Sequence, residues 1–213
     1  IESREQELVR ARDSALVSAK TKGEFAANVS HELRTPMNGI MGMLQLLETM
    51  DLNTQQEDYI KVALDSSQTL LNLIDDILDF SKIESGKLKI HADDFNPRQL
   101  VNDIIELLSI QANKKNISLS SDINDEFPTT LHGDSGRIRQ ILINLVGNAL
   151  KFTDKGSITI KLSIDKNTVN SPIRFDIVDT GIGIPRNAQK RIFQAFSQVD
   201  GSSTRKHGGT GLG

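Results

Sequence analysis

Two long stretches of this chain carry apolar residues at intervals of three and four, and this spacing is the strongest constraint on the fold. Side chains at such intervals lie on one face of an α-helix. The first stripe consists of Val29, Leu33, Met37, Ile40, Leu44 and Leu47, and the second consists of Ile60, Leu64, Ser67, Leu71, Ile74, Leu78 and Ser81. The pattern therefore predicts two long amphipathic helices.

The ends of these helices predict a hairpin. Asn53, followed three positions later by Gln56, resembles a capping box that opens the second helix, and Gly86 supplies a natural stop. A loop around Asp51 joins the two helices. Too little other chain is available nearby to cover both apolar stripes. We therefore predict that residues 23–88 form a homodimer, in which two hairpins pair into a four-helix bundle.

The segments on either side of the hairpin differ in composition. Residues 1–22 are rich in Glu, Arg, Lys and Ala at helical spacing, which predicts a coiled-coil-like signalling helix that leads into the hairpin. Residues 89–95 read as a short linker, after which the pattern changes. We expect residues 96–213 to form a second domain with its own core.

This second domain is predicted to mix helices and strands. Asn96 and Pro97 form a cap and first-turn pair for a helix that runs to about Lys115, and Asp134 caps a helix that runs through Phe152. Alternating apolar residues predict strands at residues 117–123, 158–164 and 173–178, with a turn at residues 170–172. Elements in this order indicate an α+β sandwich with its helices on one face of the sheet.

Composition excludes several classes of function. No stretch approaches the roughly 18 consecutive apolar residues that a membrane helix requires, and the first residues do not resemble a signal peptide. The absence of cysteine excludes disulfides and thiolate metal sites. A net charge of -3 offers no general attraction to a phosphate backbone, so we expect no nucleic-acid partner.

His31 is the first candidate for chemistry. It lies on the polar side of the first predicted helix, about 200° around the axis from Val29 at 100° per residue, so its imidazole is expected to face water. An uncharged ring nitrogen can attack an electrophile while Glu32 takes the proton from the other nitrogen. The alternative is an ordinary surface histidine with no role.

The helix from Asp134 to Phe152 carries a second candidate set. Asn144, Asn148 and Lys151 form a polar stripe beside the apolar one, at positions i, i+4 and i+7. Two amides can hold a hydrated metal ion and phosphate oxygens, and the lysine adds a positive charge toward a triphosphate. A solvated amphipathic helix would show the same pattern.

A third candidate set follows the last predicted strand. Strand periodicity places Asp179 on the same inward side as Phe175 and Ile177, where a carboxylate must meet a donor, and the exocyclic amine of a purine would serve. Gly181 and Gly183 would let the backbone approach a flat base closely. The alternative is an aspartate that opens an ordinary glycine turn.

The last residues are polar and rich in glycine, and they allow two interpretations. The glycine-rich run 208–213 can cradle phosphates with backbone amides, or it can be a floppy tail. Phe193 and Phe196, on a short helix just before it, can dock a lid or simply pack locally.

Taken together and in this order, these sequence motifs closely resemble those of the sensor histidine kinases of two-component signalling. The matches are the phosphoacceptor box at residues 30–36, the asparagine box at 144–153, the first glycine box at 179–183, the phenylalanine box at 193–196 and the second glycine box at 208–213. Five ordered motifs over residues 23–213 are far more specific than any single one. Residues 196–209 look most like hybrid sensor kinases, which carry receiver domains downstream.

The resemblance implies the activity of the whole core. Residues 23–88 would be the dimerisation and histidine-phosphotransfer domain, and the remainder a Bergerat-type ATP-binding domain. ATP would phosphorylate His31, and the phosphoryl group would pass to an aspartate of a response-regulator receiver domain. Thr35 matches the position that orients a hydrolytic water when such kinases act as phosphatases. We expect the core to be cytoplasmic, with any inner-membrane anchor in segments upstream.

The resemblance also implies roles for individual residues. His31 would be the nucleophile, Glu32 the base, and Asn148 the Mg²⁺ ligand, helped by Asn144. Lys151 would lie near the phosphates of ATP and Asp179 on the adenine amine. The other nucleotide-binding positions would be Gly181, Gly183, Phe193, Phe196, Gly209 and Gly211. Family members continue past the second glycine box with a helix and strands, so we expect the ATP-binding domain to be incomplete at its C-terminal end.

Two other functions fit part of the sequence. A Bergerat ATPase of the chaperone, gyrase or mismatch-repair kind places a glutamate four residues before its metal-binding asparagine, whereas this chain has Asn144 there. That class would leave His31 and the hairpin unexplained. A non-catalytic dimeric scaffold that relays signals through the lead-in helix predicts that His31→Ala leaves function intact.

Overall fold

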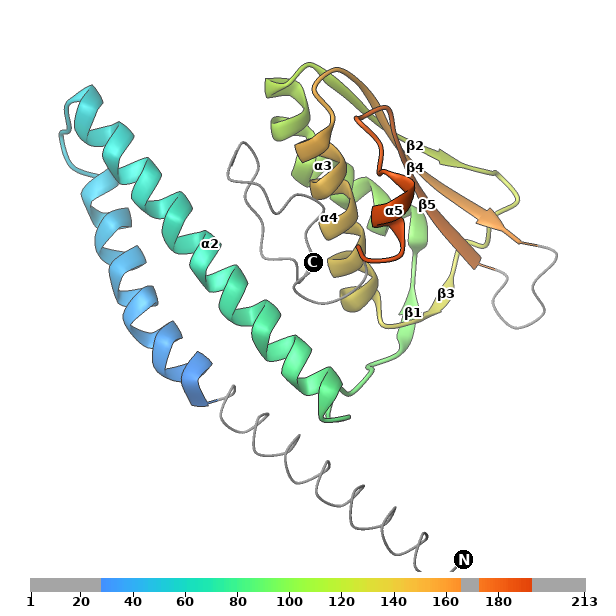
Figure 1. Cartoon of the computed structure of the whole chain (residues 1–213), viewed down its shortest axis with the longest axis horizontal. Helices are drawn as coiled ribbons and strands as arrows, with labels where there is room; N and C mark the ends of the chain where they lie inside the picture. Colours follow the sequence, from blue (N-terminus) through green and yellow to red (C-terminus); the bar gives the residue numbers. More distant parts are fainter. Residues whose placement is uncertain (1–27, 166–172, 193–213) are drawn as a thin grey trace, which may run out of the picture. The chain divides into compact units, whose positions relative to one another are not determined.

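The computed structural model describes residues 28–165 and 173–192, and the chain divides into two compact units with the boundary between Lys89 and Ile90 (Figure 1). The predicted lead-in helix at residues 1–22 and the turn at 170–172 lie outside the described residues. So do Phe193, Phe196, Gly209 and Gly211. In the described part of the chain, no helix is long and apolar enough to span a bilayer.

The first unit is the predicted helical hairpin. Its first helix covers residues 28–48 in the described part, and α2 covers Thr54–Glu84 (Figure 1). The predicted capping box is confirmed, because Asn53 Oδ1 accepts from the backbone N–H of Gln56 at 3.0 Å and Gln56 Oε1 accepts from the N–H of Asn53 at 3.0 Å. The predicted stop is also confirmed, since Gly86 follows the C-terminal end of α2 with a left-handed φ of 64°.

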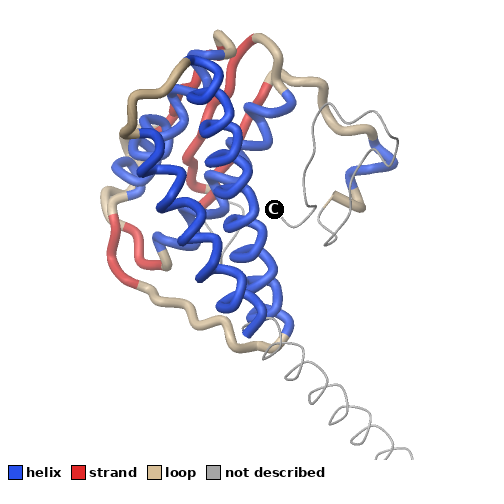
Figure 2. The backbone as a smooth tube through the Cα atoms, turned by 90° about the vertical axis from the view of Figure 1, so that its left-hand side faces the viewer, coloured by secondary structure: helices blue, strands red, loops and turns tan. Residues whose placement is uncertain are grey.

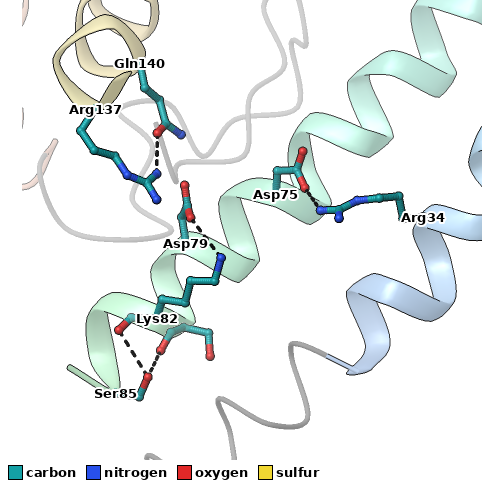
Figure 3. Close-up of polar contacts among 8 residues, drawn as sticks. Arg34, Asp75, Asp79, Lys82, Ser85, Arg137 and Gln140 are labelled. Atoms are coloured by element: carbon teal, nitrogen blue, oxygen red, sulfur yellow. Dashed lines mark hydrogen bonds and ion pairs between the residues drawn. The ribbon is translucent and has the colours of Figure 1, made fainter. Parts of the chain in front are cut away.

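The buried residues of α2 recur every seven positions. They are Ile60, Ser67 and Ile74, which all belong to the predicted stripe. An ion pair joins the two helices, with Arg34 Nη2 lying 2.5 Å from Asp75 Oδ1 (Figure 3). The heptad spacing and the cross-helix pair together define one packed seam between the helices.

The second unit is the predicted α+β sandwich. α3 (Pro97–Lys114) and α4 (Ser135–Phe152) cover one face of a sheet (Figures 1 and 2). Among the described residues this sheet has the strand order β2 (Ile117–Ile123), β4 (Gly156–Ile164) and β5 (Ile173–Asp179). β2 and β4 run parallel, whereas β4 and β5 run antiparallel. The core between the layers contains Leu100, Val101, Ile104, Leu108, Leu142, Val146, Leu150, Ile158, Ile160 and Leu162.

A small sheet and a short helix complete the second unit. β1 (Asp93–Phe95) pairs antiparallel with β3 (Leu131–Gly133), and α5 covers Arg186–Gln189. β1 falls within residues 89–95, the predicted linker. Neither strand was predicted, because three residues are too few for an alternating pattern to show.

Side chains close both ends of α4. Asp134, the predicted cap, accepts from the backbone N–H of Arg137 through Oδ1 at 3.0 Å and from that of His91 through Oδ2 at 3.0 Å. At the other end, Lys115 Nζ donates to the carbonyl of Leu150 at 2.6 Å. Lys115 precedes Asn116, whose left-handed φ of 54° turns the chain from α3 into β2.

We expect Lys115→Met to destabilise the second unit by about 1 kcal/mol, because an ammonium that caps a helix C-terminus contributes a hydrogen bond and a favourable charge–dipole interaction. Methionine is an unbranched side chain one atom shorter than lysine, and it has no donor. The measurement is the free energy of unfolding in urea. Lys114→Met, one position earlier and without that bond, serves as the control and should change it by less than about 0.5 kcal/mol.

The cap at Asp134 predicts a pH dependence. The Asp134 carboxylate accepts hydrogen bonds from the backbone N–H groups of His91 and Arg137. These bonds, with that of His91 contributing most, hold the pKa of Asp134 below its usual range. A carboxyl with a lowered folded-state pKa stabilises the fold at pH values above its ordinary pKa, and this stabilisation is lost as the pH falls through the folded-state pKa. We expect Asp134→Asn to flatten the fall of the melting temperature from about pH 5 to about pH 2.5. An equally steep fall in this variant would contradict the assignment.

Candidate active site

His31 is exposed on the first helix, as predicted, although Val29 (37%) and Leu33 (44%) of the apolar stripe are also exposed in the single chain. The side chains of Glu32 and Thr35 are exposed as well. The Thr35 hydroxyl donates to the backbone carbonyl of His31 at 3.2 Å, which ties the two residues across one helical turn. The preceding Ser30 is only 3% exposed, so the helix buries one side chain and presents the next. The imidazole is therefore open to an incoming electrophile.

The Arg34–Asp75 pair links the helix that carries His31 to α2. Arg34 lies three residues beyond His31, about 4.5 Å farther along the helix axis, and its guanidinium reaches across to α2 (Figure 3). α2 carries several carboxylates around Asp75. Partial burial is the main cause that raises the pKa of the neighbouring Asp76, and the negative charges of Asp79 and Asp75 raise it further. Arg34 thus places positive charge beside the carboxylates of α2.

The polar stripe of α4 is present as predicted. Asn144 and Asn148 are exposed one turn apart, and the partly buried Lys151 follows, with Nζ 5.1 Å from the centroid of the Phe152 ring. Amide oxygens are hard ligands of the kind that Mg²⁺ accepts beside water and phosphate. No group of three or more His, Cys, Asp or Glu residues suited to a metal exists within residues 28–165 and 173–192. The two amides on α4 are thus chemically compatible with a magnesium ion that has water and phosphate among its other ligands.

The burial expected for Asp179 is wrong. Its inward-facing neighbours Phe175 and Ile177 are partly buried, but Asp179 ends β5 and is exposed. The carboxylate turns back onto its own chain, where Oδ1 accepts from the backbone N–H of Gly181 at 2.8 Å. Strand periodicity failed here because the last residue of a strand has no core beneath it.

Sheet register places Asp179 beside the end of α4. Asp179 pairs with Ile158 at the beginning of β4, and β4 follows α4 after three residues. The loop after β5 is then held against the helix, because the N–H of Ile182 donates to the carbonyl of Phe152 at 3.3 Å. Asp179, predicted to bind a purine, and Lys151, predicted to bind phosphates, thus both lie near the C-terminal end of α4.

Gly181 packs against this helix end. A Cβ at Gly181 would lie 2.5 Å from the Phe152 carbonyl oxygen, 2.8 Å from Asp179 Oδ1 and 2.9 Å from Thr153 Oγ1. The close approach predicted for Gly181 is therefore made, in this structure, to the protein's own backbone. Gly183 has a left-handed φ of 70° and marks the turn that follows.

Two threonines at this site were missed by the sequence analysis. The Thr180 hydroxyl accepts from the N–H of Ser157 at 3.0 Å and covers Gly156, which links the loop to the beginning of β4. Thr153 is completely buried at the end of α4. Neither residue stands out in the sequence, since threonine is common at helix ends and in turns.

Two protein-family models match this chain. Residues 21–86 match the His Kinase A phosphoacceptor domain model, and residues 133–213 match the model for histidine kinase-, DNA gyrase B- and HSP90-like ATPases. The ATPase model alone would fit a gyrase-like or chaperone-like protein. The phosphoacceptor match separates the histidine kinases from that class.

Similar proteins include both sequences and solved structures. Sensor protein GacS of Pseudomonas syringae pv. syringae is 44% identical over an alignment of 214 positions, which covers all of this chain and 24% of GacS. Full-length ShkA in complex with AMPPNP has a TM-score of 0.72 at 35% identity and covers 89% of this chain and 38% of ShkA. Histidine kinase ThkA in complex with response regulator TrrA has a TM-score of 0.54 at 27% identity, covering 92% of this chain and 55% of that one.

The chain thus spans about a quarter of the curated relative it matches. Within that span it contains a phosphoacceptor hairpin with an exposed histidine and an ATPase domain with the asparagine and glycine motifs in order. The chain belongs to the sensor histidine kinases of two-component signalling.

Proposed function

We propose that the protein phosphorylates itself on His31 with ATP and passes the phosphoryl group to an aspartate of a response-regulator receiver domain. The exposed imidazole on the phosphoacceptor hairpin is the observation that carries this proposal. A non-catalytic scaffold would not need an accessible nucleophile. ThkA, a similar kinase, was crystallised with a response regulator, which supports a receiver domain as the partner, either separate or on the same longer chain.

In the first reaction, a ring nitrogen of His31 attacks the γ-phosphorus of ATP. The new N–P bond forms as the bond between the γ-phosphorus and the β,γ-bridging oxygen breaks, and ADP leaves. Positive charge that develops on the ring is relieved when Glu32 takes the proton from the other nitrogen. In the second reaction, a receiver carboxylate attacks the phosphorus and His31 is regenerated. Such transfers need mainly positioning and charge neutralisation.

In the nucleotide site, Asp179 would accept from the exocyclic amine of adenine, and Lys151 would approach the phosphates. Asn148, helped by Asn144, would hold Mg²⁺, which supplies charge neutralisation at the phosphates when bound. Gly181 and Gly183 shape the loop beside the base. Phe193, Phe196, Gly209 and Gly211 would form the lid and its phosphate contacts. AMPPNP in the ShkA complex supports an adenine nucleotide as the ligand of this fold.

We further propose a homodimer through residues 23–88. The hairpin leaves large apolar side chains on its surface that one chain does not cover: Leu33 (44% exposed), Ile40 (49%), Met43 (67%), Val62 (65%) and Ile77 (45%). A second hairpin that covers these side chains would complete a four-helix bundle. An ATP-dependent kinase core of this kind would function in the cytoplasm.

The test incubates the protein that carries this chain with γ-labelled ATP and magnesium. A phosphohistidine gives label that is lost in acid and retained in base. Thr35→Ala should keep this labelling and slow the loss of phosphate from a phosphorylated receiver domain, because Thr35 is proposed to orient water in that reaction. Acid-stable label would overturn the proposed function.

A further inference from the structure

Thr153 carries a buried hydroxyl with no hydrogen-bond partner. The residue is 0% exposed, and its Oγ1 is unpaired within the described part of the chain. Its backbone N–H donates to the carbonyl of Ala149 at 2.9 Å, so the main chain already ends α4 without help from the side chain. Buried hydroxyls without a partner destabilise a fold, and those that persist call for an explanation. The Thr153 hydroxyl therefore contributes no hydrogen bond to the fold within the described residues.

The hydroxyl lies beside the carboxylate proposed to recognise the purine. Thr153 Oγ1 and Asp179 Oδ1 lie 2.9 and 2.8 Å from a single point, the position that a Cβ of Gly181 would occupy. Because Gly181 has only hydrogen there, the space between the two oxygens is not blocked by a side chain. The two oxygens flank the α-hydrogens of Gly181, so a shift of the loop after β5 would bring them into hydrogen-bond contact.

We propose that Thr153 is a positioning residue for purine recognition, whose hydroxyl hydrogen-bonds to the Asp179 carboxylate when a nucleotide is bound. This inference rests on the proposed function. Asp179 Oδ1 already accepts from the N–H of Gly181. A second donor on the same side holds the carboxylate so that Oδ2 remains for the exocyclic amine of adenine. A guanine carbonyl at that position would face an acceptor instead, which makes the arrangement selective for adenine.

The test compares Thr153→Val, which removes the hydroxyl and keeps the shape, with Thr153→Ser, which keeps the hydroxyl. Without nucleotide, Thr153→Val should raise the melting temperature by about 2–4 °C, because an unpaired buried hydroxyl is gone. Its Kd for ATP should nevertheless rise about 10-fold, the usual effect of losing a hydrogen bond to a charged group. Thr153→Ser should bind ATP like the wild type.

A nucleotide that lacks the exocyclic amine, purine riboside triphosphate, separates positioning from general damage. If Thr153 acts through Asp179, Thr153→Val should weaken ATP binding and leave binding of this analogue unchanged. Equal weakening for both nucleotides, or unchanged ATP binding, would overturn the inference while the proposed function stands. A wild-type protein that does not bind ATP would instead overturn the proposed function.

Discussion

Replacing His31 by glutamine is expected to reduce the incorporation of label from γ-labelled ATP by at least about 1000-fold, to background. Glutamine keeps a polar side chain of similar length, but its amide nitrogen is not a nucleophile, so no N–P bond can form. His31 is exposed, and exposed substitutions usually change stability by less than about 0.5 kcal/mol. The measurement is acid-labile label per chain, with the melting temperature recorded in parallel.

His132→Gln is the matched control. His132 is also an exposed histidine, but it lies on β3 in the second unit, where its Nδ1 is 2.9 Å from Asp94 Oδ1. We expect this variant to label like the wild type. Retained label in His31→Gln would show that the phosphoacceptor is not His31. Lost label in His132→Gln with the fold intact would show that loss of label does not single out His31. Unchanged signalling by His31→Gln would favour the scaffold function.

The hairpin could be predicted in detail because its signals are long and redundant. The stripe through Ile60 and Ile74 repeats over several turns, and Asn53 with Gln56 marks the beginning of α2 chemically. The helices and three long strands of the second unit follow from the same kinds of signal. β1 and β3 could not be predicted, because their pairing is a long-range event between three-residue segments.

At the candidate site, the sequence indicates the residue types but not their environment. The exposed positions of His31, Asn144 and Asn148 follow from helical spacing, which the structure confirms. The exposure of Asp179 depends on where β5 ends, and the isolation of the Thr153 hydroxyl depends on how a distant loop packs. Both are tertiary properties that local periodicity cannot encode.

Gly181→Ala is expected to weaken ATP binding by about 100-fold and to destabilise the second unit by about 1–3 kcal/mol. The new Cβ would lie 2.5 Å from the backbone carbonyl oxygen of Phe152, which ends α4 and cannot rotate away. The loop must therefore move off the helix. That movement breaks the hydrogen bond from Ile182 to Phe152 and displaces the Asp179 carboxylate, whose Oδ1 is held by the N–H of Gly181. Calorimetric titration with ATP and urea unfolding measure the two effects.

Gly147→Ala provides the same chemical change where space is open. Gly147 lies within α4, and a Cβ there would meet nothing within 4 Å. Since alanine is a better helix former than glycine, this variant should gain about 0.5–1 kcal/mol of stability and keep its ATP affinity. If Gly181→Ala bound ATP as tightly as Gly147→Ala does, the loop after β5 would not shape the purine site. The assignment of Asp179 to the adenine amine would then lose its structural basis.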